Sequence, residues 1–405
     1  MREDVIVITL GLPEFRVLHV EESDELIEIW VEKITPAEAC PRCGYFSSQG
    51  YDERWDDVWD RPLWDKGVRL WVRKRRFSCL HLLCSFFQQE KPFAQLYASF
   101  EVHQRRTSRL DRYIYRLAKR MAHTDVVKEL ARCHTPLSDN TVGRIYHRLA
   151  QTELAGYEPE RVVAIGIDEY SVWRGHRYAT IITDPVRHWV IETFLGRDKE
   201  TVVTHLQALF PPDRIKLAVM DMNGGYEQAL LVACPGVHII IDKFHVVSVV
   251  MDALDATRKR VQRERTQAQG HRIFKLRKLL RKAAEDLDEE GQASLTAIFA
   301  QEPDLQTAYQ LKETFRAWYR LTIPEQATAK LSAWYRQVED SHFPEWQAVP
   351  ETLRSRETQI INYFYWPLTN GFTEGKNNVV GVVKRRAYGF RNFSNLRRRI
   401  LLEGT

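Results

Sequence analysis

The sequence of 405 residues lacks several features that would assign it to a particular class of protein. It contains no run of 18 or more apolar residues, which excludes a transmembrane helix of ordinary length. The N-terminus carries acids where a secretory signal peptide needs bases, and no cleavage site follows its short apolar stretch. Six cysteines are too few for a disulfide framework in a chain of this length. We therefore expect a cytoplasmic protein without a membrane partner.

The composition that remains is that of a globular protein. Hydrophobic residues make up 44% of the chain and charged residues 28%, a balance that excludes general disorder. The length allows about two to four domains. We find no internal repeat, low-complexity segment or long flexible linker, so these domains are expected to follow one another closely.

The charge is distributed unevenly along the chain, whose net charge is +5. Residues 1–60 carry 15 acids and 5 bases, whereas residues 258–282 carry 11 bases and one acid. Residues 375–402 carry 8 bases and no acid. Such runs often form only a solvated helix face, but they also generate the positive potential that attracts a polyanion.

The first 100 residues are predicted to contain strands and a metal site. Residues 5–10, 25–34 and 73–77 have the composition of strands. Two close pairs of thiols could hold a structural zinc ion in a closed tetrahedral site: Cys40, Cys43, Cys79 and Cys84. His81 could replace one thiol, and buried free cysteines remain the alternative. Cys133 and Cys234 are expected in apolar cores.

Residues 101–158 suggest a helix-turn-helix. Ser138 is a typical N-cap, and the buried stripe of the helix that follows is expected to consist of Val142, Ile145, Tyr146 and Leu149. The opposite face offers groups suited to phosphates and base edges: Asn140, Thr141, Arg144, His147 and Arg148. Two helices are expected upstream, one at residues 124–131 and one that buries Leu110, Ile114, Leu117 and Met121. Their order favours a DNA-binding unit, although a plain helical bundle stays possible.

A run of alternating strands and helices begins at Val162. Strands are expected at residues 162–172, 175–184, 188–196, 215–222 and 238–245, with a helix at 201–209. The first apolar strand is expected to end in Asp168, the fourth in Asp221 and the fifth in Asp242. This order of elements is that of an RNase H-like core, in which the ends of the first and fourth strands face one cleft.

The acids in this core predict a metal-dependent site. Carboxylates forced together repel unless they share cations, and Mg²⁺ prefers oxygen ligands. Such a site supports in-line attack at a phosphodiester. Glu374 is expected to supply the third acid from a late helix that buries Val379, Val380 and Val383. Bases in and after that helix could bind phosphates: Lys376, Lys384, Arg385, Arg386 and Arg391.

The chain resembles the ISL3 family of insertion-sequence transposases, which are DDE enzymes. The matching segments are CPRCG with Cys79 and Cys84, IGIDEYS, AVMDMNGGY, IIIDKFHVV and TNGFTEGKNNVVGVVKRRAYGFRNF. The resemblance implies that Asp168, Asp221 and Glu374 form the DDE triad. It also implies that the zinc module and helix-turn-helix bind terminal inverted repeats. The last two acids are 374 − 221 = 153 positions apart, a separation that resembles the all-helical insertion of several transposase families.

Two further features of the sequence are open to more than one interpretation. Asp242 and His245 match a DxxH pattern of related transposases, and His245 could hold a phosphate or base or be a structural histidine. Four tryptophans of the insertion could stack on a flipped base, although packing in a helical core is the simpler interpretation: Trp318, Trp334, Trp346 and Trp366.

Together these features predict a multidomain α+β protein. The expected domains are a zinc-binding β-rich module (1–100), a helix-turn-helix (101–158), an RNase H-like core in two parts (159–249 and 367–405), and a helical insertion (250–366). The expected activity is Mg²⁺-dependent nicking of element ends, with Mn²⁺ as a possible substitute, and joining of 3′-hydroxyls to target DNA. A dimer or larger multimer is expected, in a bacterial cytoplasm on nucleoid DNA. Two alternatives are a DNA-binding regulator without cleavage activity and an RNase H-like structure-specific nuclease.

Overall fold

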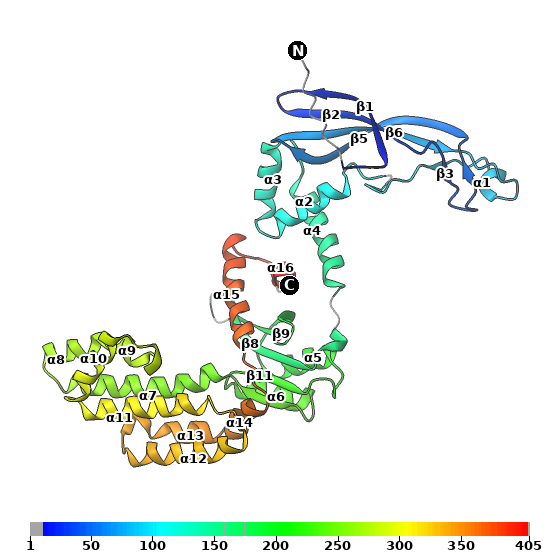
Figure 1. Ribbon diagram of the computed structural model, residues 1–405. Helices are drawn as coiled ribbons and strands as arrows, with labels where there is room; N and C mark the ends of the chain where they lie inside the picture. The colour runs from blue at the N-terminus through cyan, green and yellow to red at the C-terminus, as the bar shows by residue number, and fades with distance from the viewer. Residues whose placement is uncertain (1–10, 102, 157–158, 174, 176, 404–405) are drawn as a thin grey trace. The chain divides into compact units, whose positions relative to one another are not determined.

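The computed structural model describes residues 11–101, 103–156, 159–173, 175 and 177–403 (Figure 1). The chain divides into two compact units. The first unit comprises Met1–Tyr157 and Val383–Arg391, and the second comprises Glu158–Val382 and Asn392–Thr405. Sheets and helices together make this a mixed α/β protein. Among the described residues, none of the helices has the length and apolar character needed to cross a membrane.

The first unit begins with a twisted sheet in the order β1-β2-β6-β5, and the short β7 pairs with β6. The strand predicted at residues 25–34 is confirmed as β2, and the basic strand at 73–77 is the end of β6. The strand predicted at 5–10 lies outside the described residues. The elements of this region are β1 (Phe15–Glu22), β2 (Leu26–Lys33), β3 (Glu38–Ala39), β4 (Phe46–Ser47), β5 (Gly50–Leu63), β6 (Lys66–Phe77), α1 (Ser85–Gln88) and β7 (Phe93–Ala94).

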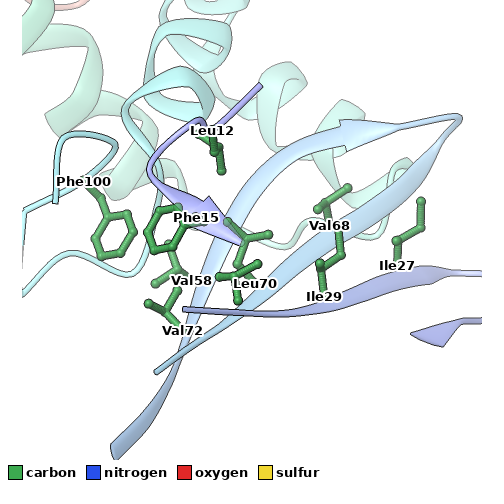
Figure 2. Packing of buried hydrophobic residues seen from close by; sticks show 10 residues of the cluster. Leu12, Phe15, Ile27, Ile29, Val58, Val68, Leu70, Val72 and Phe100 are labelled. Carbon is green, nitrogen blue, oxygen red and sulfur yellow. The ribbon is translucent and has the colours of Figure 1, made fainter. Parts of the chain in front are cut away.

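One face of this sheet carries the core of the first unit. Ile27, Ile29 and Val31 alternate along β2, so their side chains point to the same face. Val68, Leu70 and Val72 repeat this spacing on β6. Figure 2 shows most of these side chains gathered with Leu12, Phe15, Val58 and Phe100. Burial of this apolar face holds the strands in register.

Three helices complete the part of the first unit before residue 157: α2 (Ser108–Ala118), α3 (His123–Arg132) and α4 (Asp139–Leu154). Ser138 caps α4, as predicted, by accepting a hydrogen bond from the backbone N–H of Thr141. The buried positions of α4 include Val142, Ile145 and Tyr146, and α4 packs on α2 and α3. The first helix is shorter than predicted, since α2 ends at Ala118 and Met121 lies beyond it.

The second unit contains a five-stranded sheet in the order β10-β9-β8-β11-β12. β8, β9 and β10 are antiparallel neighbours, while β11 runs parallel to both β8 and β12. The predicted sequence of three strands, helix, strand, helix and strand is therefore present. Its elements are β8 (Ala164–Trp173), β9 (Arg177–Asp184), β10 (Trp189–Leu195), α5 (Lys199–Leu209), β11 (Leu217–Met220), α6 (Gly224–Ala233) and β12 (His238–Ile241), after a short 3₁₀ turn at Pro159–Arg161.

Only helices and 3₁₀ turns follow between Lys243 and Tyr365. The long helix α7 starts directly after β12 and packs on α11, and α14 returns to pack on β12. The elements are α7 (Lys243–Arg263), α8 (Gln267–Lys275), α9 (Arg277–Arg281), α10 (Glu289–Phe299), α11 (Pro303–Trp318), α12 (Glu325–Asp340), α13 (Ala348–Arg354) and α14 (Glu357–Tyr365), with 3₁₀ turns at Ala284–Asp286 and Pro344–Trp346.

Two final helices return the chain to the sheet: α15 (Gly371–Arg386) and α16 (Phe393–Glu403). Val380 and Val383 of α15 are buried, as predicted, whereas Val379 is only half-buried. α16 packs against β10, where Arg397 forms an ion pair with Glu192. The start of α15, up to Val382, belongs to the same unit as β8 and β11.

Candidate active site and metal sites

Two of the three predicted catalytic acids lie on neighbouring strands. Asp168 lies on β8, and Asp221 directly follows β11, which pairs in parallel with β8 as far as Gly166 and Val219. Extending this register by two residues (166 + 2 and 219 + 2) sets Asp168 level with Asp221. The prediction that Asp168 ends its strand is wrong, because β8 continues to Trp173 by pairing with β9. Asp168 nevertheless lies where the neighbour β11 has ended.

The surroundings of Asp168 disfavour its charged form. Its carboxylate accepts hydrogen bonds of 2.7 Å from the backbone N–H of Glu169 and from the side-chain amide of Asn377. Burial nevertheless raises the pKa of Asp168 to about 6, and the carboxylates of Asp221 and Glu374 add to the rise. Acids in this arrangement repel one another unless a cation lies between them.

Glu374 lies in the first turn of α15, beside two other titratable residues. The ring Nδ1 of His245 lies 3.8 Å from the Glu374 carboxylate and 3.7 Å from that of Asp242. One ligand atom from each of these three residues lies within 4.8 Å of the others. This grouping of Glu374 with Asp242 and His245 is not predictable from their spacing in the sequence.

The charges of Asp242, His245 and Glu374 offset one another in part. The carboxylate of Asp242 raises the pKa of His245, against the effect of burial. Burial acts to raise the pKa of Asp242, but His245 and the N–H groups of Asn370 and Phe244 lower it overall. Burial raises the pKa of Glu374, and Asp242 adds to this effect. The protonated form of His245 is therefore favoured between two carboxylates.

Two asparagines that were not among the predicted site residues connect these acids. The backbone N–H of Asn370 donates to Asp242 at 2.8 Å, and its carbonyl accepts from the N–H of Glu374 at 2.9 Å. The side-chain amide of Asn377 donates to Asp168 and, at 3.2 Å, to the carbonyl of Glu169. A spacing of three residues, 377 − 374, sets Asn377 on the same helix face as Glu374. This spacing in TEGKNN was the signal available in the sequence.

The donor set of this region suits a hard divalent cation. Asp168, Asp221 and Glu374 offer carboxylate oxygens, the ligands that Mg²⁺ and Mn²⁺ prefer. Their ligand atoms do not form a group within 4.8 Å of one another in the described residues, where Glu374 is grouped with Asp242 and His245 instead. Burial, with the carboxylates of Asp221 and Glu374, raises the pKa of Asp168, so its charged form would gain from compensation by a positive charge. A bound cation would supply that compensation.

The four predicted zinc ligands lie together in the first unit. Cys40 Sγ is 3.8 Å from Cys84 Sγ, and Cys43 Sγ is 3.6 Å from Cys79 Sγ. All four sulfurs lie within 4.8 Å of one another. Four thiolates at Zn–S bonds of about 2.3 Å would lie about 3.8 Å apart, so the cluster could bind zinc. His81 is exposed and lies outside the cluster.

Local structure explains why these thiols converge. Cys40 and Cys43 lie in the turn between β3 and β4, where Gly44 has a φ of +74°. Cys79 follows β6, and Cys84 precedes α1. Phe77, Phe93 and Phe86 pack around the cluster, which leaves the module with a small core of its own. Cys133 and Cys234 are buried elsewhere, as predicted.

Comparison with known proteins gives the context of these sites. Residues 165–400 match the family description of the ISL3 DDE transposases. The chain belongs to this family. It is 26% identical over 382 residues to the transposase for insertion sequence element IS1001 of Bordetella parapertussis, a match that covers 93% of this chain and 91% of that protein. It is 27% identical over 278 residues to the transposase for insertion sequence element IS1557 of Mycobacterium tuberculosis, which covers 62% of each chain. This protein is a DNA transposase, and its family implies an RNase H-like core, DNA binding and use of a divalent metal.

The predicted DNA-binding residues on α4 of this transposase differ in how exposed they are and in their side-chain partners. Arg144 is exposed and donates to the Thr141 hydroxyl at 3.2 Å. His147 is half-buried. Arg148 forms an ion pair with the buried Asp111 of α2 and remains 49% exposed. Thr141, expected on the polar face, is buried, because its hydroxyl meets that of Ser138 at 2.9 Å.

The predicted basic residues of the C-terminal region fall in both units of the transposase. Lys376 lies in the second unit and donates to the carbonyl of Glu403 at 2.8 Å. Lys384, Arg385, Arg386 and Arg391 lie in the segment that belongs to the first unit. Arg385, Arg386 and Arg391 are exposed.

Three of the four insertion tryptophans are core residues. Trp318, Trp334 and Trp346 are at most 3% exposed. Their indole N–H groups donate to the Ala327 carbonyl, the Leu311 carbonyl and the Thr257 hydroxyl. Trp366 is half-buried and stacks on His238 at a centroid distance of 4.3 Å. The transposase therefore uses these four rings for packing.

Proposed function

We propose that this transposase cuts DNA at the ends of its insertion sequence and joins the resulting 3′-hydroxyls to target DNA. The observation that carries the proposal is the half-buried pair Asp168 and Asp221 on neighbouring strands, where the pKa of Asp168 is raised to about 6. Such a pair lowers stability without a cation, and it is the arrangement that a metal-dependent phosphoryl transfer needs.

Asp168, Asp221 and Glu374 are the residues that would hold two Mg²⁺ ions, with Mn²⁺ as a substitute. Bound there, the ions would stabilise the charge that develops on the phosphate. The protein itself contributes positioning: Asn377 orients the Asp168 carboxylate at 2.7 Å, and Asn370 fixes the N–H of Glu374. His245, favoured in its protonated form, is suited to a contact with a phosphate oxygen.

The reaction would proceed by two transfers at phosphorus. Water first attacks a phosphodiester at the element end, so that one P–O bond forms while the bond to the leaving 3′-oxygen breaks. The freed 3′-hydroxyl then attacks a target phosphodiester in the same manner. No covalent protein intermediate is required, because each leaving oxygen departs as the new bond forms.

The first unit would recognise the terminal inverted repeats. The exposed Arg144, with His147 and the half-exposed Arg148, lies on the helix that follows the turn of a helix-turn-helix arrangement. The four-cysteine cluster would hold a structural zinc ion that fixes the β-rich module. Lys384, Arg385, Arg386 and Arg391 of this unit add positive charge for the DNA backbone, and Lys376 of the second unit does the same. Two ends must be joined, so a dimer or larger multimer is the expected assembly.

The decisive test is cleavage of a labelled duplex that carries the element's own end, with Mg²⁺ present. The wild-type protein is compared with Asp221→Asn and with Asp213→Asn, which changes an exposed acid outside the site. We expect nicks that leave 3′-hydroxyls in the wild type and in Asp213→Asn, and no nicks in Asp221→Asn. Specific binding without cutting under Mg²⁺ or Mn²⁺ would instead indicate a DNA-binding regulator, and cutting governed by DNA shape would indicate a structure-specific nuclease.

A further inference from the structure

A cavity of about 390 Å³ opens beside Glu374 in the second unit. Its walls come from segments far apart in the sequence, since Lys243 and Phe244 start α7 while Arg316, Tyr319 and Arg320 lie on or just after α11 of the helical insertion. Pockets for small ligands span about 300–1,000 Å³, so this one suits a single nucleotide rather than a duplex. The insertion therefore contributes part of the wall next to a predicted catalytic acid.

Two aromatic side chains line this cavity, Phe244 and Tyr319. Phe244 is 66% exposed although it follows the buried Asp242 by only two residues. Tyr319 is 5% exposed, and its buried hydroxyl has no hydrogen-bond partner among the described residues. An exposed ring costs free energy in water, and so does a buried hydroxyl without a hydrogen-bond partner. Both costs would fall if a planar, polar ligand occupied the cavity.

The charges of the cavity are divided between acids and bases. Asp242 and Glu374 have ligand atoms within 4.8 Å of each other. Lys243, Arg316 and Arg320 supply three cations, of which Arg316 is paired with Glu285 and Glu313. Arg320 is 57% exposed and pairs with Glu285, which is itself 45% exposed. An exposed pair of this kind contributes little to stability, so Arg320 can exchange its partner for a phosphate at low cost.

We propose that this cavity is a subsite for one nucleotide of the DNA next to the cleaved phosphodiester. In this arrangement the base packs on Phe244. The nucleotide has two phosphates, and the one that is not cleaved faces Arg320. The inference rests on the proposed function, because the nucleotide belongs to the DNA that the three acids would cut. It assigns the helical insertion a direct role in holding the substrate.

The test combines a Phe244→Ala variant with a series of end duplexes, each lacking one base at a position around the cleavage site. We expect the wild type to lose about 5- to 150-fold in nicking rate when one particular base is absent, the range that loss of one stacked base implies. Phe244→Ala should lose a similar factor on the intact duplex and little more on the duplex that lacks that base. This non-additivity would identify the base that contacts Phe244.

Controls separate this inference from its alternatives. Phe274→Ala removes another exposed aromatic of the insertion, which does not line the cavity, and should leave the rate unchanged. Arg320→Ala should slow nicking, and a neutral methylphosphonate at the neighbouring phosphate should abolish that difference. Additive losses at every position, or an unchanged rate in Phe244→Ala, would overturn the subsite. Absence of nicking by the wild type would instead refute the proposed function.

Discussion

Asn377 connects two of the predicted catalytic acids through one turn of α15. Its amide holds Asp168 on β8, and Glu374 lies three residues earlier on the same helix face. The helix that carries the third acid is therefore fastened to the strand that carries the first. A neutral amide suits this position, because it donates to a carboxylate without the charge that would compete with a metal ion.

We expect Asn377→Ala to slow nicking of the element-end duplex by about tenfold or more, because a hydrogen bond to a charged group contributes about 1.5–3 kcal/mol. Since Asp168 would lose its orientation, the Mg²⁺ concentration for half-maximal rate should also rise. Asn378→Ala is the matched control, because Asn378 is the exposed neighbour on the same helix. An unchanged Mg²⁺ dependence in Asn377→Ala would exclude a positioning role.

Lys312 is a buried cation in the helical insertion. It is fully buried, its ammonium donates to the carbonyl of Lys282 at 2.8 Å, and it pairs with Glu313. Burial lowers the pKa of Lys312 from 10.5 to about 8. Between these two values the unfolded chain keeps a proton that the native chain has released. The stability contributed by this group therefore rises with pH across that window.

Replacing Lys312 by Met should remove this dependence on pH. We expect the stability of the variant relative to the wild type to fall by up to about 3 kcal/mol between pH 8 and pH 10.5, the free energy that corresponds to the pKa shift. Urea unfolding followed by tryptophan fluorescence measures it. Lys330→Met, at an exposed position of α12, should show no such change. A constant difference between Lys312→Met and the wild type would contradict the prediction.

At the scale of elements, the approach of α15 to β8 depends on a single glycine. A Cβ at Gly166 would lie 2.4 Å from the Thr373 hydroxyl, 2.7 Å from that of Thr183 and 2.8 Å from the Asn370 side chain. Thr373 and Thr183 also share a hydrogen bond of 2.8 Å. The start of α15 can therefore lie against β8 only because residue 166 has no side chain.

We expect Gly166→Ala to destabilise the second unit by about 1–3 kcal/mol, the cost of overpacking a filled core. The nicking rate should fall by more than the loss of folded protein explains, because Glu374 and Asn377 would move away from Asp168. Gly375→Ala is the control in stability, since a Cβ there meets nothing within 4 Å. Thermal unfolding and nicking rates measure both effects, and full activity in the Gly166→Ala variant would refute this dependence.

The order of strands and helices in the second unit was predictable from the sequence. Strands such as residues 238–241 are short apolar runs, and a strand buried on both faces needs such a run. The exact end of β8 was not predictable, because it depends on which neighbour continues beside it. The grouping of Asp242, His245 and Glu374 was equally hidden, since it arises from a contact between residues 129 positions apart (374 − 245).

At the scale of the whole molecule, the number of bases at residues 258–282 is larger than the number of unpaired bases that the insertion exposes. Arg258, Arg260 and Arg265 belong to the basic run at 258–282, but each is paired with an acid of the same unit. Arg272, Lys278 and Arg281 of α8 and α9 are exposed. A sequence gives the number of charges in a segment, but the partners of each charge depend on tertiary packing. The net positive charge that this run offers to a polyanion is therefore smaller than its count of bases.

The division into two units, each with its own sheet, predicts that loss of zinc affects only one of them. The four cysteines lie within Met1–Tyr157, and the three predicted catalytic acids lie within Glu158–Val382. We expect Cys79→Ser to bind less zinc than the wild type and to show a lower unfolding temperature of the first unit, because a structural zinc ion contributes directly to folding. The transition of the second unit should not move, which differential scanning calorimetry can check.

The same variant should separate recognition from chemistry. We expect Cys79→Ser to lose specific binding to the element-end duplex while it keeps weak Mg²⁺-dependent nicking of unrelated DNA, since the acids remain in an intact unit. Cys133→Ser is the matched control, because Cys133 is a buried thiol of the first unit outside the cluster. If Cys79→Ser lost zinc but bound the end duplex as tightly as the wild type, the cysteine module would have no part in recognition, and α4 with the basic residues of 384–391 would have to supply it.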